Sequence, residues 1–265
     1  MDSEKCTQAF DTFLIGKVPK FPGKTIFAKV WGSHSHDCAR ATSDVDFLAV
    51  YMSTPADFLG LLAPVATVDA TGPDFQAHEL GKFCQLLLKG NPGIVECLFT
   101  EQFCVQMWPF TELVAERRRF LTARCVEAYA AYARSQLHRL EAGRSVHASG
   151  GDPTEKWAFH MARLMQDATR IAQGKDPEVV KTGVARQFLL NLREGIYPLS
   201  EAVQYTHAAL EHLEHLRPSW EVAPPVDVDW LNTWLVGVRW KYAEILDVRA
   251  DLVAPSVEET EYIDW

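Results

Sequence analysis

The feature that most constrains this chain is an apolar strand that begins with two aspartates. Asp44 and Asp46 stand two residues apart and run directly into the apolar segment 47–51. Residues two apart in a strand project from the same face, so both carboxylates would point the same way. Two such carboxylates repel each other unless a cation lies between them, and oxygen ligands of this kind suit Mg²⁺. The spacing therefore predicts a divalent metal site, and the alternative is a strand edge with two solvated aspartates.

A Gly-Ser pair lies upstream, at the end of another β-rich run. Gly32 and Ser33 follow the segment 25–31, and ten residues separate Ser33 from Asp44. A tight turn of this composition offers a backbone N–H and a hydroxyl to a phosphate oxygen. We expect Ser33 near the N-cap of a short helix over 33–41, where it could cap the helix, bind a phosphate, or do both. This stretch therefore indicates a nucleotide beside the metal.

Composition narrows the class of protein. With 265 residues, 48% of them hydrophobic, the chain can build one large domain or two modest ones. Its net charge of −9 disfavours a broad basic surface for duplex nucleic acid, although a local basic cleft is compatible with it. No apolar run is long enough to span a membrane, and the six cysteines form no CxxC pair, which is typical of reduced, buried thiols. We therefore expect a soluble cytoplasmic protein with no membrane partner.

The periodicity changes along the chain. Alternating or apolar runs predict strands over 24–31 and 45–52 and two short strands within 64–78, and helical spacing begins at Glu79. Beyond residue 105 only helical patterns remain. They cover 113–142, 155–173, 185–193, 199–216 and 228–246. The pattern predicts an α+β chain in which residues 1–105 form a catalytic domain with a small mixed sheet. Residues 106–265 would form an all-helical domain with an acidic C-terminal tail.

The order strand, Gly-Ser, short helix and Asp-x-Asp resembles the DNA polymerase β-like nucleotidyltransferase superfamily. Four longer stretches are similar to the YcgL-type predicted nucleotidyltransferases, some of which are described as RNA-repair-pathway members. These stretches are 31–51, 78–99, 120–140 and 155–165. The chain departs from that pattern at 34–38 (HSHDC), where those proteins often have a small Gly-containing segment. The resemblance implies a polymerase β-like nucleotidyltransferase domain that transfers a nucleoside monophosphate from an NTP to a hydroxyl and releases pyrophosphate.

The resemblance also implies a carboxylate set that holds two divalent ions, Mg²⁺ or alternatively Mn²⁺. Asp44 and Asp46 would be the first ligands, and a third carboxylate would come from a neighbouring strand. Asp74, at the start of the second short strand, is the first candidate, with Asp69 and Glu79 as alternatives. A turn aspartate explains Asp74 equally well.

The nucleotide would be held from two sides. Gly32 and Ser33 would bind the phosphates of the NTP, with ATP among the candidates. Lys156 and His160 are one helical turn apart, and Arg163 follows one turn later, so the three share a helix face. The resemblance implies that a lysine from the helical part reaches the triphosphate. A solvated charged face is the alternative.

The acceptor follows from the resemblance alone, which suggests an RNA 3′ end. A small-molecule or protein hydroxyl is the alternative, as in adenylylating enzymes that use the same metal site. A catalytically silent NTP-binding protein is a second alternative.

Overall fold

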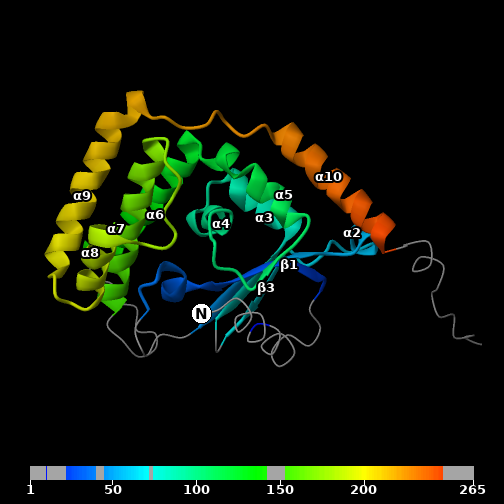
Figure 1. Ribbon diagram of the computed structural model, residues 1–265, viewed down its shortest axis with the longest axis horizontal. Helices are drawn as coiled ribbons and strands as arrows, with labels where there is room; N and C mark the ends of the chain where they lie inside the picture. The colour runs from blue at the N-terminus through cyan, green and yellow to red at the C-terminus, as the bar shows by residue number, and fades with distance from the viewer. Residues whose placement is uncertain (1–9, 11–21, 40–44, 72–73, 142–152, 247–265) are drawn as a thin grey trace, which may run out of the picture.

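The computed structural model describes residues 10, 22–39, 45–71, 74–141 and 153–246 (Figure 1). Its centre is a five-stranded sheet with the strand order β3-β4-β2-β1-β5. The strands are β1 (Lys24–Trp31), β2 (Asp46–Met52), β3 (Thr67–Ala70), β4 (Phe75–Glu79) and β5 (Val105–Gln106). β2 and β4 run parallel and the other neighbours are antiparallel, so the sheet is mixed, as predicted.

The central strand, β2, is apolar on both faces because both faces are covered. Leu48 and Val50 of β2 belong to the core on the helical side of the sheet. Phe47, Ala49 and Tyr51 belong to a smaller core on the opposite side. This explains why the segment reads as a continuous apolar run rather than an alternating one.

Short helices follow the strands on one side of the sheet, and α3 packs directly on β2 and β4. They are α2 (Pro55–Leu59), α3 (Leu80–Leu88), α4 (Pro92–Cys97) and α5 (Phe110–Ala115). α3 begins where the side chain of Glu79 accepts a hydrogen bond from the backbone N–H of Gly81 at 2.6 Å. α4 begins with Pro92 at its first turn, capped by the side chain of Asn91.

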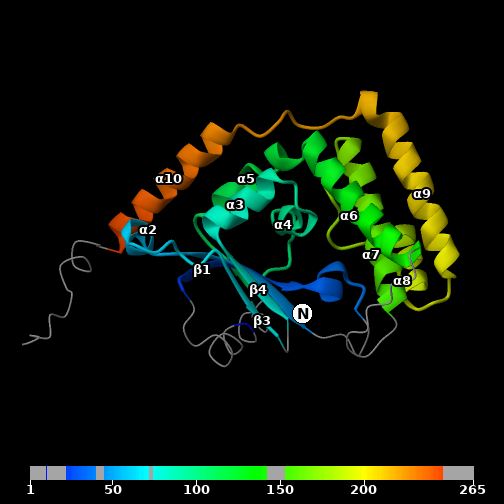
Figure 2. The ribbon, with the colours of Figure 1, turned by 180° about the vertical axis from the view of Figure 1, so that it is seen from behind.

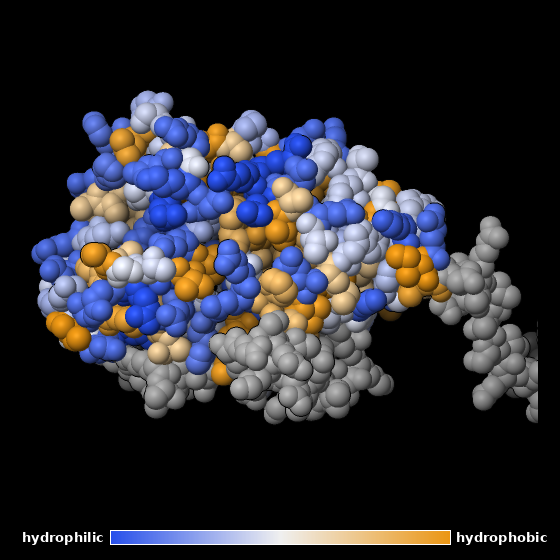
Figure 3. Space-filling model, in the orientation of Figure 1, coloured by the Kyte–Doolittle hydropathy of each residue, from blue (hydrophilic) through white to orange (hydrophobic). Residues whose placement is uncertain are grey.

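Longer helices form the second half. They are α6 (Ala123–Glu141), α7 (Pro153–Ala172), α8 (Gly183–Arg193), α9 (Leu199–Leu216) and α10 (Val228–Ile245), with one-turn 3₁₀ helices η2 (Arg117–Phe120) and η3 (Arg217–Ser219). The predicted helical region 113–142 thus divides into α5, η2 and α6. α6, α7 and α9 lie side by side in both views (Figures 1 and 2). Their outer face is mostly hydrophilic, with hydrophobic residues scattered over it (Figure 3), as amphipathic helices require.

The last helix returns to the sheet half. Between η3 and α10 the chain crosses α6, where the N–H of Ala223 donates to the carbonyl of Leu121 at 2.9 Å. α10 then packs on α2 and α3. One cluster of buried residues consequently runs from Ile26 in β1 to Tyr242 in α10. The division into residues 1–105 and 106–265 stays a prediction.

The cysteines are of two kinds. Cys38, Cys84, Cys97 and Cys125 are free and buried. Cys104 is joined in a disulfide whose partner lies outside the described residues, so the prediction that all six are reduced is wrong for Cys104. A pairing made by the fold leaves no local spacing signature. In the described part of the chain, no helix is both long and apolar enough to cross a membrane.

Candidate active site

The Gly-Ser turn and one aspartate meet at the same end of the sheet. Asp46 opens β2 directly opposite Trp31, the last residue of β1. Gly32 follows with φ +68°, and a β-carbon at this position would lie 3.1 Å from Oδ2 of Asp46. A side chain here would be both strained and crowded, so glycine lets the backbone pass close to the carboxylate. The fold therefore places Gly32 next to the first residue of the aspartate strand.

The turn itself is shorter than predicted. It is a 3₁₀ helix, η1 (Gly32–His36), with Trp31 at the N-cap position and no side-chain cap. The expected helix over 33–41 capped by Ser33 is therefore wrong. Asp37 stops it, because its φ of 54° is left-handed. The hydroxyl of Ser35 donates to the carbonyl of Gly32 at 2.7 Å and closes the turn from inside.

Asp74 lies beside Asp46. The backbone N–H of Phe47 donates to the carbonyl of Asp74 at 3.0 Å, and Phe47 pairs with Phe75 in the parallel ladder. Asp46 and Asp74 thus precede paired residues of adjacent strands, which by register puts their side chains on one face. Asp74 is exposed and Asp46 is half-buried. The sheet therefore brings one predicted ligand and the first candidate for the third carboxylate to one edge.

The two alternatives to Asp74 have protein partners. Asp69, on β3, accepts a hydrogen bond from Nε2 of Gln76 at 2.9 Å. Glu79 is buried at the far end of β4, where it caps α3 and lies 3.4 Å from Nη2 of Arg239. Burial raises the pKa of Glu79. Its position, at the opposite end of β4 from Asp74, separates it from Asp46.

The donor set at this edge consists of carboxylate oxygens, which fits Mg²⁺ or Mn²⁺. Asp44 lies outside the described residues. In the part of the chain that the structure describes, no three His, Cys, Asp or Glu side chains come together as a metal site. Because Gly32 has no side chain, the space beside Oδ2 of Asp46, which a β-carbon would fill, stays open.

The predicted face of α7 divides into an exposed and a buried part. Lys156 is exposed near the start of the helix. His160 is partly buried, and desolvation, with the nearby charges of Arg163 and Lys156, lowers its pKa to about 3. Arg163 is buried, and its Nη1 donates to Oε1 of Glu96 at 2.5 Å. Of the three, only Lys156 has its side chain in solvent.

Sequence reasoning missed the buried charges behind η1. Glu96, Asp167 and Lys181 are at most 1% exposed, and Lys29 is fully buried, with no hydrogen-bond partner for its Nζ among the described residues. Burial lowers the pKa of Lys29, and Cys97, Glu96 and Arg163 lie within electrostatic reach of it. One signal was available, because Glu96 interrupts the apolar run of α4. A carboxylate in such a run needs a buried partner.

The sequence matches the RNA repair pathway DNA polymerase beta family over residues 7–237. Among curated proteins there is no match. Among solved structures, the chain is similar to a nucleotidyltransferase-like protein from Exiguobacterium sibiricum 255-15. The two are 16% identical, the likeness covers 78% of this chain and 73% of that one, and the TM-score is 0.30. The family match spans the aspartate strand, the Gly-Ser turn and helices α6 to α9.

Proposed function

This chain belongs to the RNA repair pathway DNA polymerase beta family, and from that premise we propose that it transfers a nucleoside monophosphate from an NTP to a hydroxyl acceptor. One observation carries the proposal. The backbone of Gly32 passes against Oδ2 of Asp46, so a turn that can hold phosphate adjoins a carboxylate that can hold a cation. Asp74 stands just before the neighbouring strand β4, at the same end of the sheet.

The metal would be Mg²⁺, with Mn²⁺ as the alternative, held as two ions by Asp44, Asp46 and Asp74. Bound there, it would neutralise charge on the phosphate oxygens. Gly32 and Ser33 would orient the triphosphate through backbone N–H groups and the Ser33 hydroxyl. Asp74 is exposed, and we expect it also to hold the acceptor hydroxyl and take its proton.

The helical half would contribute the cation. Lys156 is exposed on α7, so its ammonium is available to a triphosphate tail. His160 would be uncharged at neutral pH because its pKa lies at about 3, so it could contribute a neutral hydrogen bond but no charge. We therefore assign charge neutralisation to Lys156 and a lesser contact to His160.

An RNA end is the acceptor we propose. The description of the family as an RNA repair pathway supports it. The net charge of −9 favours a short contact with a terminus over a long footprint on RNA, since phosphate contacts need cationic partners.

The test supplies each labelled NTP with Mg²⁺ to the full chain in the presence of total RNA, protein or metabolites. We expect label on RNA. Label on protein or on metabolites would identify that class, in place of RNA, as the acceptor. Absence of transfer to any of the three would contradict the proposed function.

Variants then test the site. Asp46→Asn should reduce transfer at least about 100-fold, because a ligand carboxylate is lost. Asp229→Asn, an exposed aspartate on α10, is the matched control and should transfer like wild type. Unchanged transfer by Asp46→Asn would contradict the site. Comparison of Asp74→Asn with Asp69→Asn identifies the third carboxylate, and we expect the loss in Asp74→Asn.

A further inference from the structure

The proposed phosphate turn is held at its far end by a buried histidine. His36, the last residue of η1, is 4% exposed. Its Nδ1 lies 2.8 Å from the carbonyl oxygen of Val179. A carbonyl only accepts, so Nδ1 carries the hydrogen and donates it. Desolvation, with Arg163 and Lys29 nearby, keeps the pKa of His36 well below its usual value, so the ring is neutral.

The segment that accepts this hydrogen bond is itself fixed to α7. Oδ1 of Asp167 accepts from Nζ of Lys181 at 2.6 Å and from the backbone N–H of Glu178 at 3.0 Å. These two bonds hold the chain on both sides of Val179. The carbonyl that meets His36 therefore has a set position relative to α7.

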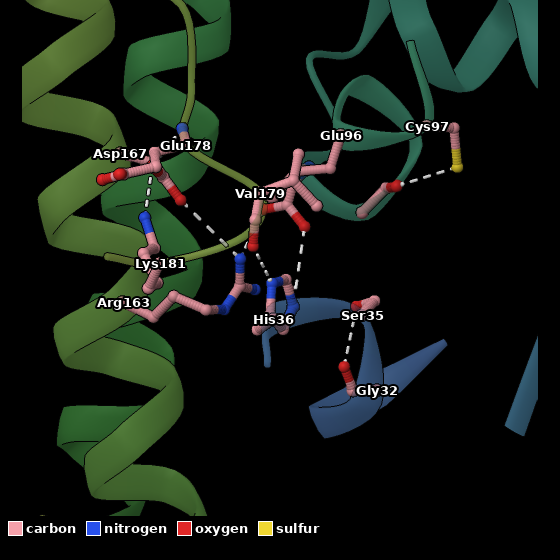
Figure 4. Close-up of polar contacts among 12 residues, drawn as sticks. Gly32, Ser35, His36, Glu96, Cys97, Arg163, Asp167, Glu178, Val179 and Lys181 are labelled. Carbon is pink, nitrogen blue, oxygen red and sulfur yellow. Dashed lines mark hydrogen bonds and ion pairs between the residues drawn. The ribbon is translucent and has the colours of Figure 1, made fainter. Parts of the chain in front are cut away.

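Further buried charges surround the histidine (Figure 4). Nη1 of Arg163 donates to Oε1 of Glu96 at 2.5 Å and lies 3.8 Å from Oδ2 of Asp167. The other oxygen of Glu96, Oε2, lies 3.9 Å from Nε2 of His36, which carries no hydrogen in this tautomer, so Glu96 adjoins the ring without bonding to it. Elements η1, α4 and α7 and the segment 178–181 thus meet in one buried network. Hydrogen bonds among buried charges are strong, so the bonded members, Arg163 with Glu96 and Lys181 with Asp167, resist displacement.

The turn needs this support. A one-turn 3₁₀ helix has poor hydrogen-bond geometry and little stability of its own. Within it, the bond from Ser35 to Gly32 fixes the first residues relative to one another but not relative to the rest of the protein. Beyond the strand that precedes it, the turn is placed by the contacts of His36 and by Asp37, whose carbonyl accepts from Nε of Arg186 at 3.2 Å.

We propose that His36 is a positioning residue, and that its hydrogen bond to the Val179 carbonyl sets the orientation of Gly32 and Ser33 toward the NTP phosphates. This inference rests on the proposed function. Through this hydrogen bond the segment around Val179 acts on nucleotide binding without touching the nucleotide. A displacement of about 1 Å at such a turn is enough to impair the reaction severely.

Two replacements of His36 separate its hydrogen bond from its bulk. The side-chain amide introduced by His36→Asn can donate from nearly the position of Nδ1. The longer amide introduced by His36→Gln reaches the position of Nε2 and misses Val179. We expect His36→Gln to raise the KM for NTP about tenfold, the size of one hydrogen bond, with the acceptor KM unchanged. His36→Asn should restore the KM to near wild type.

A purely structural role would give another pattern. Leu213→Ala opens a cavity in α9 and should lower the melting temperature, yet leave the KM for NTP unchanged, because less folded protein reduces only the apparent kcat. An unchanged KM in His36→Gln would overturn the inference, and so would an equal KM in His36→Asn and His36→Gln. Wild-type protein that binds no NTP would overturn the proposed function and this inference together, a result visible before any variant is made.

A second variant covers the case in which His36→Gln does not fold. The double change Asp167→Leu with Lys181→Met replaces a buried ion pair by apolar groups of similar size, which proteins commonly tolerate. It releases the segment around Val179 while leaving His36 in place. We expect a raised KM for NTP in this folded variant, and a wild-type KM would overturn the inference.

Discussion

Two groups of carboxylates in this protein face opposite environments. At the end of the sheet, Asp46 is half-buried and Asp74 is exposed. Behind the turn, Glu96 is 1% and Asp167 0% exposed, and each contacts a buried Arg or Lys side chain. The first group lies at an edge of the sheet that solvent reaches, whereas Arg163 and Lys181 pair with the second. Access to solvent, rather than the number of acidic residues, distinguishes a ligand site from an internal support.

The largest effect should come from breaking the buried group. Arg163→Met leaves Glu96 without its main partner, and we expect a loss of about 3–5 kcal/mol in the free energy of unfolding, measured by urea titration. Arg118→Met is the matched control, because Arg118 pairs with Asp176 on the surface, with 71% of its side chain exposed. It should cost less than about 1 kcal/mol. Equal losses in the two variants would contradict the comparison.

Substitutions at the open end of the sheet, where Asp46 and Asp74 lie, should change activity more than stability. Gly32→Ala forces a β-carbon against Oδ2 of Asp46 and should reduce NTP transfer by roughly 100-fold. Gly183→Ala is the control, because Gly183 also has a positive φ, 54°, but no described atom lies within 4 Å of the position of its β-carbon. Each substitution should lower stability by about 1–2 kcal/mol. A control as inactive as Gly32→Ala would show that backbone strain alone causes the loss.

The sequence predicted the open end far better than the buried one. Gly32, Ser33 and the strand after Asp46 follow from local patterns, because a tight turn and an apolar run are properties of neighbouring residues. The pair Glu96 and Arg163 joins residues 67 apart. Hydrophobic periodicity carries no information about such a contact.

Two errors have the same origin. The helix expected over 33–41 ends after one turn because Asp37 adopts a left-handed conformation, where its carboxylate meets Nε of Arg186 in α8 at 3.1 Å. Cys104 forms a disulfide although its local spacing suggested a reduced thiol. In both cases a tertiary contact overrode the local pattern. The predicted position of β2 agrees with the structure, because burial of its apolar residues on both faces of the sheet favours the same strand as the local pattern.

The pH dependence of stability offers a finer test. The pKa of His160 is about 3 in the folded protein, against an ordinary value near 6.5. As the pH falls below 6.5, the unfolded chain takes up a proton that the folded chain refuses until about pH 3, so stability is lost across this window. His160→Gln should make the decline shallower by at most about 1.4 kcal/mol per pH unit.

Urea titrations at pH 8, 7, 6 and 5 measure this difference. The curves for wild type and His160→Gln should run parallel between pH 7 and 8, where neither state binds the proton. His36 shifts in the same direction, so part of the decline should remain in the variant. Identical slopes below pH 6.5 would contradict the assignment.

The smallest effect should come from Lys29. Its Nζ is fully buried and has no hydrogen-bond partner within the described part of the chain, although it lies 5.4 Å from the centre of the Trp31 ring, so Lys29→Met removes a poorly compensated ammonium while keeping a similar volume. We expect the free energy of unfolding to rise by about 1 kcal/mol in urea titrations. A lower free energy of unfolding in Lys29→Met would mean that the charge of Lys29 is needed to balance the charge of Glu96.

The return of α10 to the sheet half has a consequence for biosynthesis. Arg239 of α10 lies 3.7 Å above the ring of Phe58 and contacts Glu79, and Leu235 approaches Gly81. These partners belong to segments that leave the ribosome about 150 to 180 residues earlier, since chains emerge N-terminus first. The part of the surface of α2 and α3 that α10 covers therefore stays exposed until α10 has left the ribosome. The half of the protein that is made first is the half that finishes folding last.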